Sequence, residues 1–335
     1  MKKFILKLLF YLSPLLIVLA VYALKDPFKV IYHYDAYYKP DDSDYFSLCS
    51  DYVSTETLIR NYPKYHYDSY IFGGSRSGVY PAKEWGLLIH SAHCFHYSAE
   101  YESLYGVEKK FEFIRKKNYA LKNALVVIDD DLLSDTANGN GYLKMKHPLL
   151  SGQSAYKFQT EFIKDFFDKD FLPAYLGLAF AKNKREYAEE HSVMKFLKFH
   201  YDDQTNEFFR FDLEQQIATD SAGYYAKLKN ILYQRDSVQH YSKQVIGSRQ
   251  KELLTSIKQI LSENNTVYKI VISPLYDQIR IDTNDLHVLW QIFGKQNVFD
   301  FSGINALTQD PHHYYEISHY RPLVASKIMD SVYKN

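Results

Sequence analysis

The chain contains, at residues 67–78, the stretch YDSYIFGGSRSG, in which an apolar run ends in a turn rich in glycine and serine. Short apolar runs bounded by turn residues are typical of buried strands, so we expect a strand over residues 67–72. Similar runs predict further strands at residues 94–97, 124–128, 267–272 and 297–301. Helical spacing of apolar residues predicts helices at residues 104–117, 154–180 and 253–261, and a last one beginning at Pro322.

This alternation favours an α/β fold, in which a parallel sheet is flanked by helices on both faces with flavodoxin-like layering. Residues 185–245 fit the alternation poorly, and we interpret them as a helical insertion over the site. Residues 26–66 are polar and rich in tyrosine, which is typical of a connector. We therefore place the α/β domain at residues 67–335.

The N-terminal residues have the features of a membrane anchor. Lysines at positions 2, 3 and 7 precede an apolar run over residues 8–24 that only Ser13 and Pro14 interrupt. With its apolar flanks, the run is long enough to cross about 30 Å of hydrocarbon as a helix. The lysines predict an N-terminus in the cytoplasm, so we expect a cytoplasmic tip and transmembrane anchor over residues 1–25. A signal peptide cleaved near Ala23 is the alternative, and both place the rest of the chain beyond the membrane.

The composition excludes several classes of protein. Forty basic residues balance forty acidic ones, so the chain lacks the basic excess of a nucleic-acid-binding protein. Cys49 and Cys94 are too few for a disulfide framework or a structural zinc site, and a bond between them stays open. The 32 tyrosines suit boundaries between polar and apolar groups, such as carbohydrate surfaces, although a compositional bias would look the same.

Two short motifs carry side chains suited to nucleophilic catalysis. Ligands of parallel sheets gather at the carboxyl ends of the strands, and Ser75 follows the first strand there. A nucleophilic serine needs a tight turn with small neighbours, which the adjacent glycines supply. Glu316 and His319 lie three residues apart before the last helix and pair a carboxylate with a base. Asp310 and His313 form an alternative pair with the same spacing.

These motifs resemble the SGNH (GDSL-like) hydrolase superfamily, which has a serine in a turn after its first strand and a late acid-x-x-His motif. GSRS at residues 74–77 and YEISHYRP at residues 315–322 are similar to its membrane-anchored branch. That branch includes the alginate O-acetylation proteins and the teichoic-acid D-alanyl transfer protein. Its shared plan is one N-terminal anchor followed by an extracytoplasmic domain.

The resemblance also implies roles for individual residues. Ser75 would be the nucleophile, His319 the base and Glu316 the acid that orients it. Gly74, Arg76 and Asp131 are the candidates for binding the oxyanion or the substrate. Arg76, next to Ser75, would either pair with an anionic substrate or bridge to a carboxylate. The family usually has Asp in place of Glu316, and a Gly-x-Asn-Asp block in place of residues 129–131. Without the Asn of that block, backbone N–H groups around Arg76 would hold the oxyanion alone.

By the same resemblance, the chain is an extracytoplasmic serine esterase or O-acyltransferase anchored in the bacterial cytoplasmic membrane by one helix. It would act on a cell-surface polysaccharide or its acyl donor through an acyl-Ser75 intermediate, without a cofactor or a metal. A membrane-bound O-acyltransferase would be its partner. The alternative is an inactive scaffold of the same fold in a polysaccharide modification or export complex.

Other patterns point to different chemistry. Asp129 and Asp131 resemble the Asp-x-Asp motif of haloacid-dehalogenase-type phosphatases, which would require Mg²⁺. The glycine-rich turn also resembles a phosphate-binding loop, but it lacks the Gly-Lys-Ser/Thr ending. His90, His93 and His96 would suit zinc if they lay on one helix, whereas on a strand His93 points away from the other two.

Overall fold

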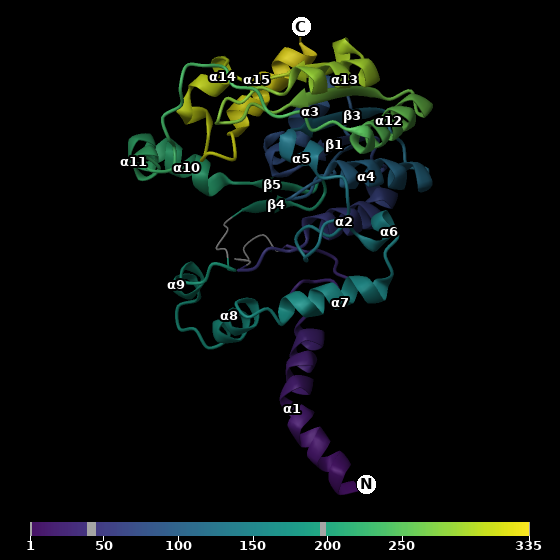
Figure 1. Cartoon of the computed structure of the whole chain (residues 1–335), viewed down its shortest axis with the longest axis vertical. Helices are drawn as coiled ribbons and strands as arrows, with labels where there is room; N and C mark the ends of the chain where they lie inside the picture. The colour runs from purple at the N-terminus through teal and green to yellow at the C-terminus, as the bar shows by residue number, and fades with distance from the viewer. Residues whose placement is uncertain (1, 39–44, 195–198, 335) are drawn as a thin grey trace.

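Five parallel strands form the central sheet of the computed structural model, which describes residues 2–38, 45–194 and 199–334 (Figure 1). The strands are β1 (Ser69–Gly73), β2 (Cys94–His96), β3 (Asn123–Ile128), β6 (Val267–Ile272) and β7 (Val298–Asp300). They lie in the order β2-β1-β3-β6-β7, and every pairing is parallel. The predicted α/β fold with a parallel sheet is confirmed, and each of the predicted strands is present.

The strand order creates a reversal in the middle of the sheet. From β1 the chain moves outward to β2 and then returns past β1 to β3, so the direction of winding changes between β1 and β3. Ligands of open parallel sheets bind beyond the carboxyl ends of the strands at such a reversal. The glycine-rich turn follows β1 and Asp129 follows β3, so both lie at this point.

Helices cover both faces because successive side chains of each strand point to opposite faces. Tyr70 and Phe72 of β1 pack into the core on one face, and Ile71 between them packs into the core on the other. The first face is covered by α4 (Leu104–Lys116), α12 (Ser248–Glu263) and α13 (Thr283–Phe293). The second face is covered by α3 (Ala82–Ile89) and α15 (Pro322–Tyr333), which begins at the predicted proline.

Two predicted segments divide differently in the structure. The helix expected over residues 154–180 is two helices, α7 (Ala155–Phe166) and α8 (Phe171–Leu178). The Asp168 carboxylate accepts the N–H groups of Asp170 and Phe171, which favours a new start there. The expected connector over residues 26–66 contains the helix α2 (Ser50–Tyr65). Much of the buried face of α2 is polar, so the apolar pattern did not indicate it.

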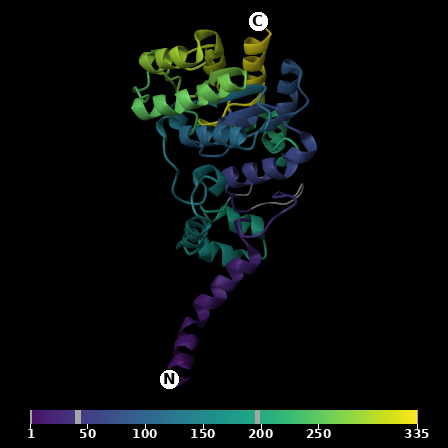
Figure 2. The ribbon, with the colours of Figure 1, turned by 90° about the vertical axis from the view of Figure 1, so that its right-hand side faces the viewer.

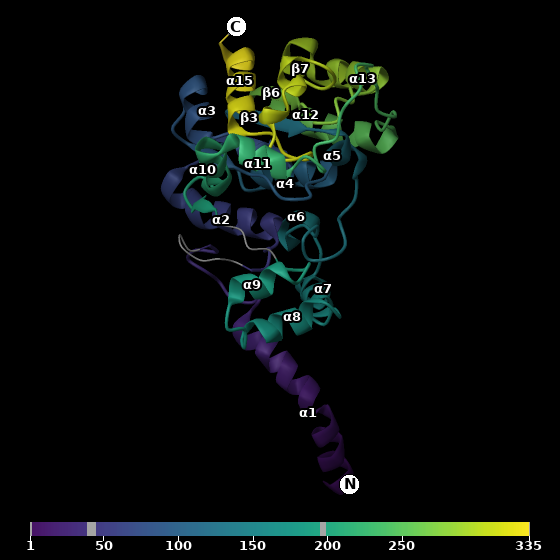
Figure 3. The same cartoon turned by 90° about the vertical axis from the view of Figure 1, so that its left-hand side faces the viewer.

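The expected helical insertion also contains strands. β4 (His200–Asp202) and β5 (Glu207–Phe209) pair antiparallel, and α10 (Phe211–Thr219) and α11 (Ser221–Lys227) follow them. Figure 3 shows α10 and α11 beside the N-terminal end of α15. The remaining short elements are η1 (Ser75–Val79), α5 (Asp130–Ser134), α6 (Pro148–Ser151), α9 (Lys184–Glu189), η2 (Lys295–Asn297), α14 (Ala306–Gln309) and η3 (Pro311–His313).

Helix α1 (Lys2–Lys25) projects from the body of the molecule (Figure 2). Across the described part of the chain, no helix is on its own long and apolar enough to cross a membrane. The pair Lys2–Leu8 and Phe10–Lys25, bent by 44°, meets the length and composition requirements together. Pro14 has no N–H for the Phe10 carbonyl, and the Ser13 hydroxyl donates to that carbonyl instead, at 2.7 Å.

We expect Gly73→Ala to lower the free energy of unfolding by roughly 3 kcal/mol or more. Gly73 has φ of +150°, and a Cβ there would lie 2.7 Å from the Val127 carbonyl oxygen of the neighbouring strand. The measurement is urea unfolding followed by circular dichroism.

Gly78→Ala is the matched control in the same turn, because a Cβ at Gly78 meets nothing within 4 Å. We expect this variant to unfold within about 1 kcal/mol of the wild type. Equal stability of the two alanine variants would contradict the close approach of β1 and β3 at Gly73.

Candidate active site

The turn after β1 presents Ser75 to solvent. Gly73 ends the strand in a conformation that glycine adopts readily, and η1 begins two residues later. Ser77 fixes the turn, because its N–H and its hydroxyl both donate to the Gly74 carbonyl oxygen, at 2.9 and 2.7 Å. The Ser75 side chain therefore stands exposed at the carboxyl end of β1.

A loop that precedes α15, here called the site loop (residues 314–320), carries Glu316 and His319. Tyr314 and Tyr320 form an antiparallel bridge that closes its base. The buried Tyr320 hydroxyl donates to the hydroxyl of Tyr80, the residue directly after η1, at 3.3 Å. This buried contact joins the site loop to the turn that carries the serine.

The structure brings Ser75, His319 and Glu316 together. Ser75 Oγ lies 2.9 Å from His319 Nε2, and His319 Nδ1 lies 2.5 Å from Glu316 Oε1. Because Nδ1 faces a carboxylate, we assign the ring proton to Nδ1, which leaves Nε2 to accept the hydrogen bond from the Ser75 hydroxyl. This geometry suits a serine nucleophile, its base and the acid that orients the base.

Glu316 is held in its charged form. Burial raises its pKa, but hydrogen bonds from the His319 ring and from the Ser318 N–H outweigh burial, so the net shift is downward. The Ser318 N–H donates to Oε2 at 2.7 Å, while His319 occupies Oε1. With both oxygens engaged, Glu316 fixes the direction of the imidazole ring.

Arg76 connects the serine turn to two neighbouring segments. Its Nε donates to the Ser318 carbonyl oxygen at 3.0 Å, one residue before His319. Its Nη1 pairs with Asp129 at 2.7 Å, and the two side chains are only 17% and 7% exposed. Asp131 adds a longer pair, at 3.4 Å, from an exposed carboxylate. Of the two alternatives for Arg76, pairing with an anionic substrate or bridging to a carboxylate, the structure has the bridge to a carboxylate.

The other residues predicted near the nucleophile lie in different surroundings. Asp129 caps α5 by accepting the Leu132 N–H at 2.9 Å. The same carboxylate therefore both stabilises this helix and pairs with Arg76. Asp131 lies in the first turn of α5 with its side chain 86% exposed. At Gly74, a Cβ would meet only the Glu102 Cβ among the described atoms, at 3.9 Å, which leaves room beside the nucleophile.

The alternative pair, Asp310 and His313, is engaged elsewhere. The buried His313 donates from Nδ1 to the Leu307 carbonyl oxygen at 2.7 Å, and its Nε2 lies 3.1 Å from Lys327 Nζ. Asp310 caps η3. Of the two acid-x-x-His pairs, the structure therefore places Glu316 and His319, and not this one, at the serine.

In the part of the chain that the structure describes, the three histidines considered for zinc do not form a metal site, and Cys49 is not bonded to Cys94. His90 lies at the C-terminal end of α3, the His93 ring bonds to a backbone carbonyl, and His96 is buried in β2. Residues 2–38, 45–194 and 199–334 contain no group of three His, Cys, Asp or Glu side chains that could hold a metal ion. Cys49 and Cys94 are both buried, free thiols.

Helices α10 and α11 support the site loop through contacts that the sequence did not predict. Arg321, the residue after the loop, forms a two-point ion pair with Glu214 of α10, at 2.9 and 2.6 Å. The Tyr224 hydroxyl of α11 donates to the Tyr315 carbonyl oxygen at 3.0 Å. In the sequence, these side chains look like those of any solvated helix face.

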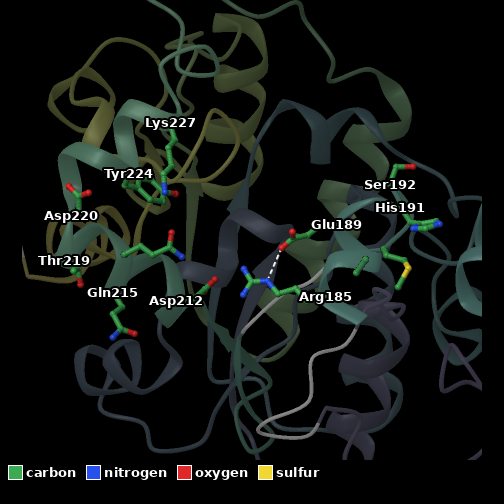
Figure 4. A pocket seen from close by; sticks show the side chains of 13 residues that line it. Arg185, Glu189, His191, Ser192, Asp212, Gln215, Thr219, Asp220, Tyr224 and Lys227 are labelled. Carbon is green, nitrogen blue, oxygen red and sulfur yellow. Dashed lines mark hydrogen bonds and ion pairs between the residues drawn. The ribbon is translucent and has the colours of Figure 1, made fainter. Parts of the chain in front are cut away.

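A pocket of about 770 Å³ opens between α9 on one side and α10 and α11 on the other (Figure 4). Its lining includes Glu189, Asp212, Gln215 and Lys227. Tyr224 belongs both to this lining and to the contacts that hold the site loop. The described residues that line the pocket do not include Ser75, so the pocket adjoins the support of the site loop rather than the nucleophile.

The β4–β5 hairpin supports the serine turn from another direction. The His96 N–H donates to the Thr205 carbonyl oxygen at 2.9 Å, and the His96 ring donates from Nε2 to the Ser77 carbonyl oxygen at 2.8 Å. Burial lowers the pKa of His96 to about 4, so the ring is neutral. Burial also raises the pKa of Glu207 in β5 to about 7, despite the Thr205 hydroxyl and the Ala82 N–H, which lower it.

We expect Arg76→Ala to lower the free energy of unfolding by about 3 kcal/mol, because it leaves the buried Asp129 carboxylate unpaired. The double variant Arg76→Ala with Asp129→Asn removes that charge, and we expect it to recover part of the loss. Arg249→Ala breaks an exposed pair with Glu252 and should cost less than about 1 kcal/mol. Urea unfolding of the three variants checks this, and a double variant no more stable than Arg76→Ala would contradict it.

We expect Glu207→Gln to stabilise the protein at pH 8 by about 3 kcal/mol and to change little at pH 4.5. The unfolded carboxyl loses its proton near pH 4.5, whereas the native one holds it to about pH 7. Native-state stability therefore falls as pH rises between these values and levels off above them. The measurement is urea unfolding at both pH values, with the exposed Glu252→Gln as control. A gain at pH 8 no larger than that at pH 4.5 would contradict the raised pKa.

Comparison with known proteins gives no family for this chain: no protein-family model matches it, and no curated protein matches it.

Proposed function

We propose that the protein is a serine esterase or O-acyltransferase that forms an acyl intermediate on Ser75. The observation that carries the proposal is the 2.9 Å contact between Ser75 Oγ and His319 Nε2, with Glu316 on the opposite ring nitrogen. Two residues separated by 244 positions in the sequence meet at proton-transfer distance. The exposed setting of Ser75 at the sheet reversal supports access by a substrate.

The first half of the reaction transfers an acyl group to the enzyme. His319 Nε2 takes the Ser75 hydroxyl proton as Oγ bonds to the ester carbonyl carbon. The tetrahedral intermediate then collapses, the bond between carbonyl carbon and ester oxygen breaks, and the departing oxygen takes the proton from His319. Glu316 stabilises the imidazolium that forms between these two proton transfers.

The second half releases the acyl group. An acceptor hydroxyl or a water gives its proton to His319 as the acceptor oxygen bonds to the acyl carbon. The proton then passes from His319 to Ser75 Oγ as the bond between the acyl carbon and Oγ breaks. Water as acceptor makes the protein an esterase, and a sugar hydroxyl makes it an O-acyltransferase. The partly exposed His319 side chain, 41% accessible, is compatible with a large acceptor such as a polymer chain.

The site motifs and the apolar N-terminal helix together support a more specific version. We infer that α1 anchors the protein in a membrane and that the α/β domain acts on acyl groups of a cell-surface polysaccharide beyond it, as the resemblance to membrane-anchored SGNH proteins implies. A membrane-bound O-acyltransferase is then the natural source of the acyl group. The many charged and amide side chains of the pocket between α9 and α11 are compatible with a hydroxyl-rich ligand.

The test is labelling of the full-length protein in detergent with a fluorophosphonate, which reacts with activated serines. We expect Ser75→Ala to abolish labelling and His319→Ala to slow it by about 10² or more, because the serine then lacks its base. Glu316→Gln should slow it less than His319→Ala, because the ring loses only its orientation and charge partner. The measurement is the labelling rate by gel fluorescence.

His313→Gln is the matched control, since His313 belongs to the other acid-x-x-His pair. We expect it to label like the wild type. If wild-type protein with native circular dichroism does not label at all, the proposal of catalysis fails and the inactive scaffold takes its place. Labelling that survives Ser75→Ala would overturn the assignment of the nucleophile.

A further inference from the structure

The end of α1 that joins the body is packed against the layer formed by α7 and α8. Tyr22 is buried, with its ring 5.0 Å from that of Phe166 at the end of α7, and Val18 packs against the same apolar cluster. By contrast, the helix is largely exposed before Val18, with Phe10 73% and Ile17 62% accessible. Figure 3 shows α8 directly above the end of α1.

The length of α1 leaves no spare turn between the membrane and this layer. Residues 4–24 contain the apolar run and its flanks, and 21 helical residues rise at most about 31 Å, less across the 44° bend. The hydrocarbon core is about 30 Å thick, so an anchor made of this helix uses its whole apolar length. The turns at Val18 and Tyr22 then lie inside the outer half of the membrane, together with the side chains packed on them.

Helix α8 and the residues after it have the composition of an interfacial segment. The sequence of α8 is FLPAYLGL. Its last four residues, Tyr175–Leu178, are only partly buried by the rest of the protein. Phe180, just beyond it, is 87% exposed. Lys182 and Lys184 follow, also exposed. Apolar side chains beside lysines are typical of segments that lie in the headgroup region of a membrane.

We propose that α8 and residues 179–184 are embedded in the outer surface of the membrane that α1 crosses, with Phe180 in the lipid. This inference rests on the anchoring role of α1 under the proposed function and is independent of the chemistry at Ser75. Its physical basis is the packing of Tyr22 on Phe166, which fixes the height of this layer relative to the anchor. The domain is then held at the membrane by two adjoining apolar surfaces.

The experiment uses the full chain in nanodiscs of phosphatidylcholine and phosphatidylglycerol. An environment-sensitive NBD fluorophore is attached to a single introduced cysteine, as Phe180→Cys, Leu16→Cys or Leu87→Cys. The native cysteines are buried, and wild type treated with the same NBD reagent gives the background. Leu16 reports on the anchor, and Leu87 of α3, 78% exposed, is the matched control on the α/β domain.

We expect the label at position 180 to emit at shorter wavelength and to be quenched by doxyl-labelled lipid several-fold more strongly than the label at position 87. Quenching at 16 without quenching at 180 would overturn the inference and leave the anchor intact. Quenching at neither position would remove the anchor and the inference together, while fluorophosphonate labelling of Ser75 would be unaffected. A short-wavelength emission at 180 without lipid quenching would mean that protein covers Phe180, which also overturns it.

Discussion

The guanidinium of Arg76 joins the turn that carries it to two parts of the chain that lie far from it in the sequence. It binds the Asp129 carboxylate after β3 and the Ser318 carbonyl of the site loop. The pair with Asp129 is largely removed from water, so it fixes the direction of the guanidinium whose Nε donates to the site loop. Together with the Tyr320–Tyr80 contact, this bonding holds the site loop beside the serine turn, which the local sequence of neither segment could do.

Most of the sheet could be predicted because buried parallel strands are continuous apolar runs with distinct ends. The run at Val267–Ile272 agrees with the structure at both ends. Helix α2 was not predicted, because much of its buried face consists of polar side chains such as Asp51 and Thr55. Their burial depends on partners elsewhere in the chain. The β4–β5 hairpin was not predicted, because strands of three residues are too short to show an alternation of apolar and polar side chains.

Some residues of the candidate site could likewise be predicted from the sequence, and others could not. Ser75, Glu316 and His319 could be found because each belongs to a short local motif whose residue types suit one chemistry. Although the two acid-x-x-His pairs have the same spacing, the position directly before the last helix favoured Glu316 with His319 over Asp310 with His313. Support from Glu214 and Tyr224 could not be predicted, because their contacts arise from the docking of α10 and α11. The roles of the meeting residues in catalysis stay predictions.

The two buried thiols have a practical consequence. Burial raises the pKa of Cys49 and of Cys94 to about 12, so almost no thiolate forms at neutral pH. Thiolate is the species that is oxidised or exchanges with disulfides, and both residues are therefore inert. While the protein is folded, we therefore expect both thiols to stay free and unmodified, since neither is open to solvent.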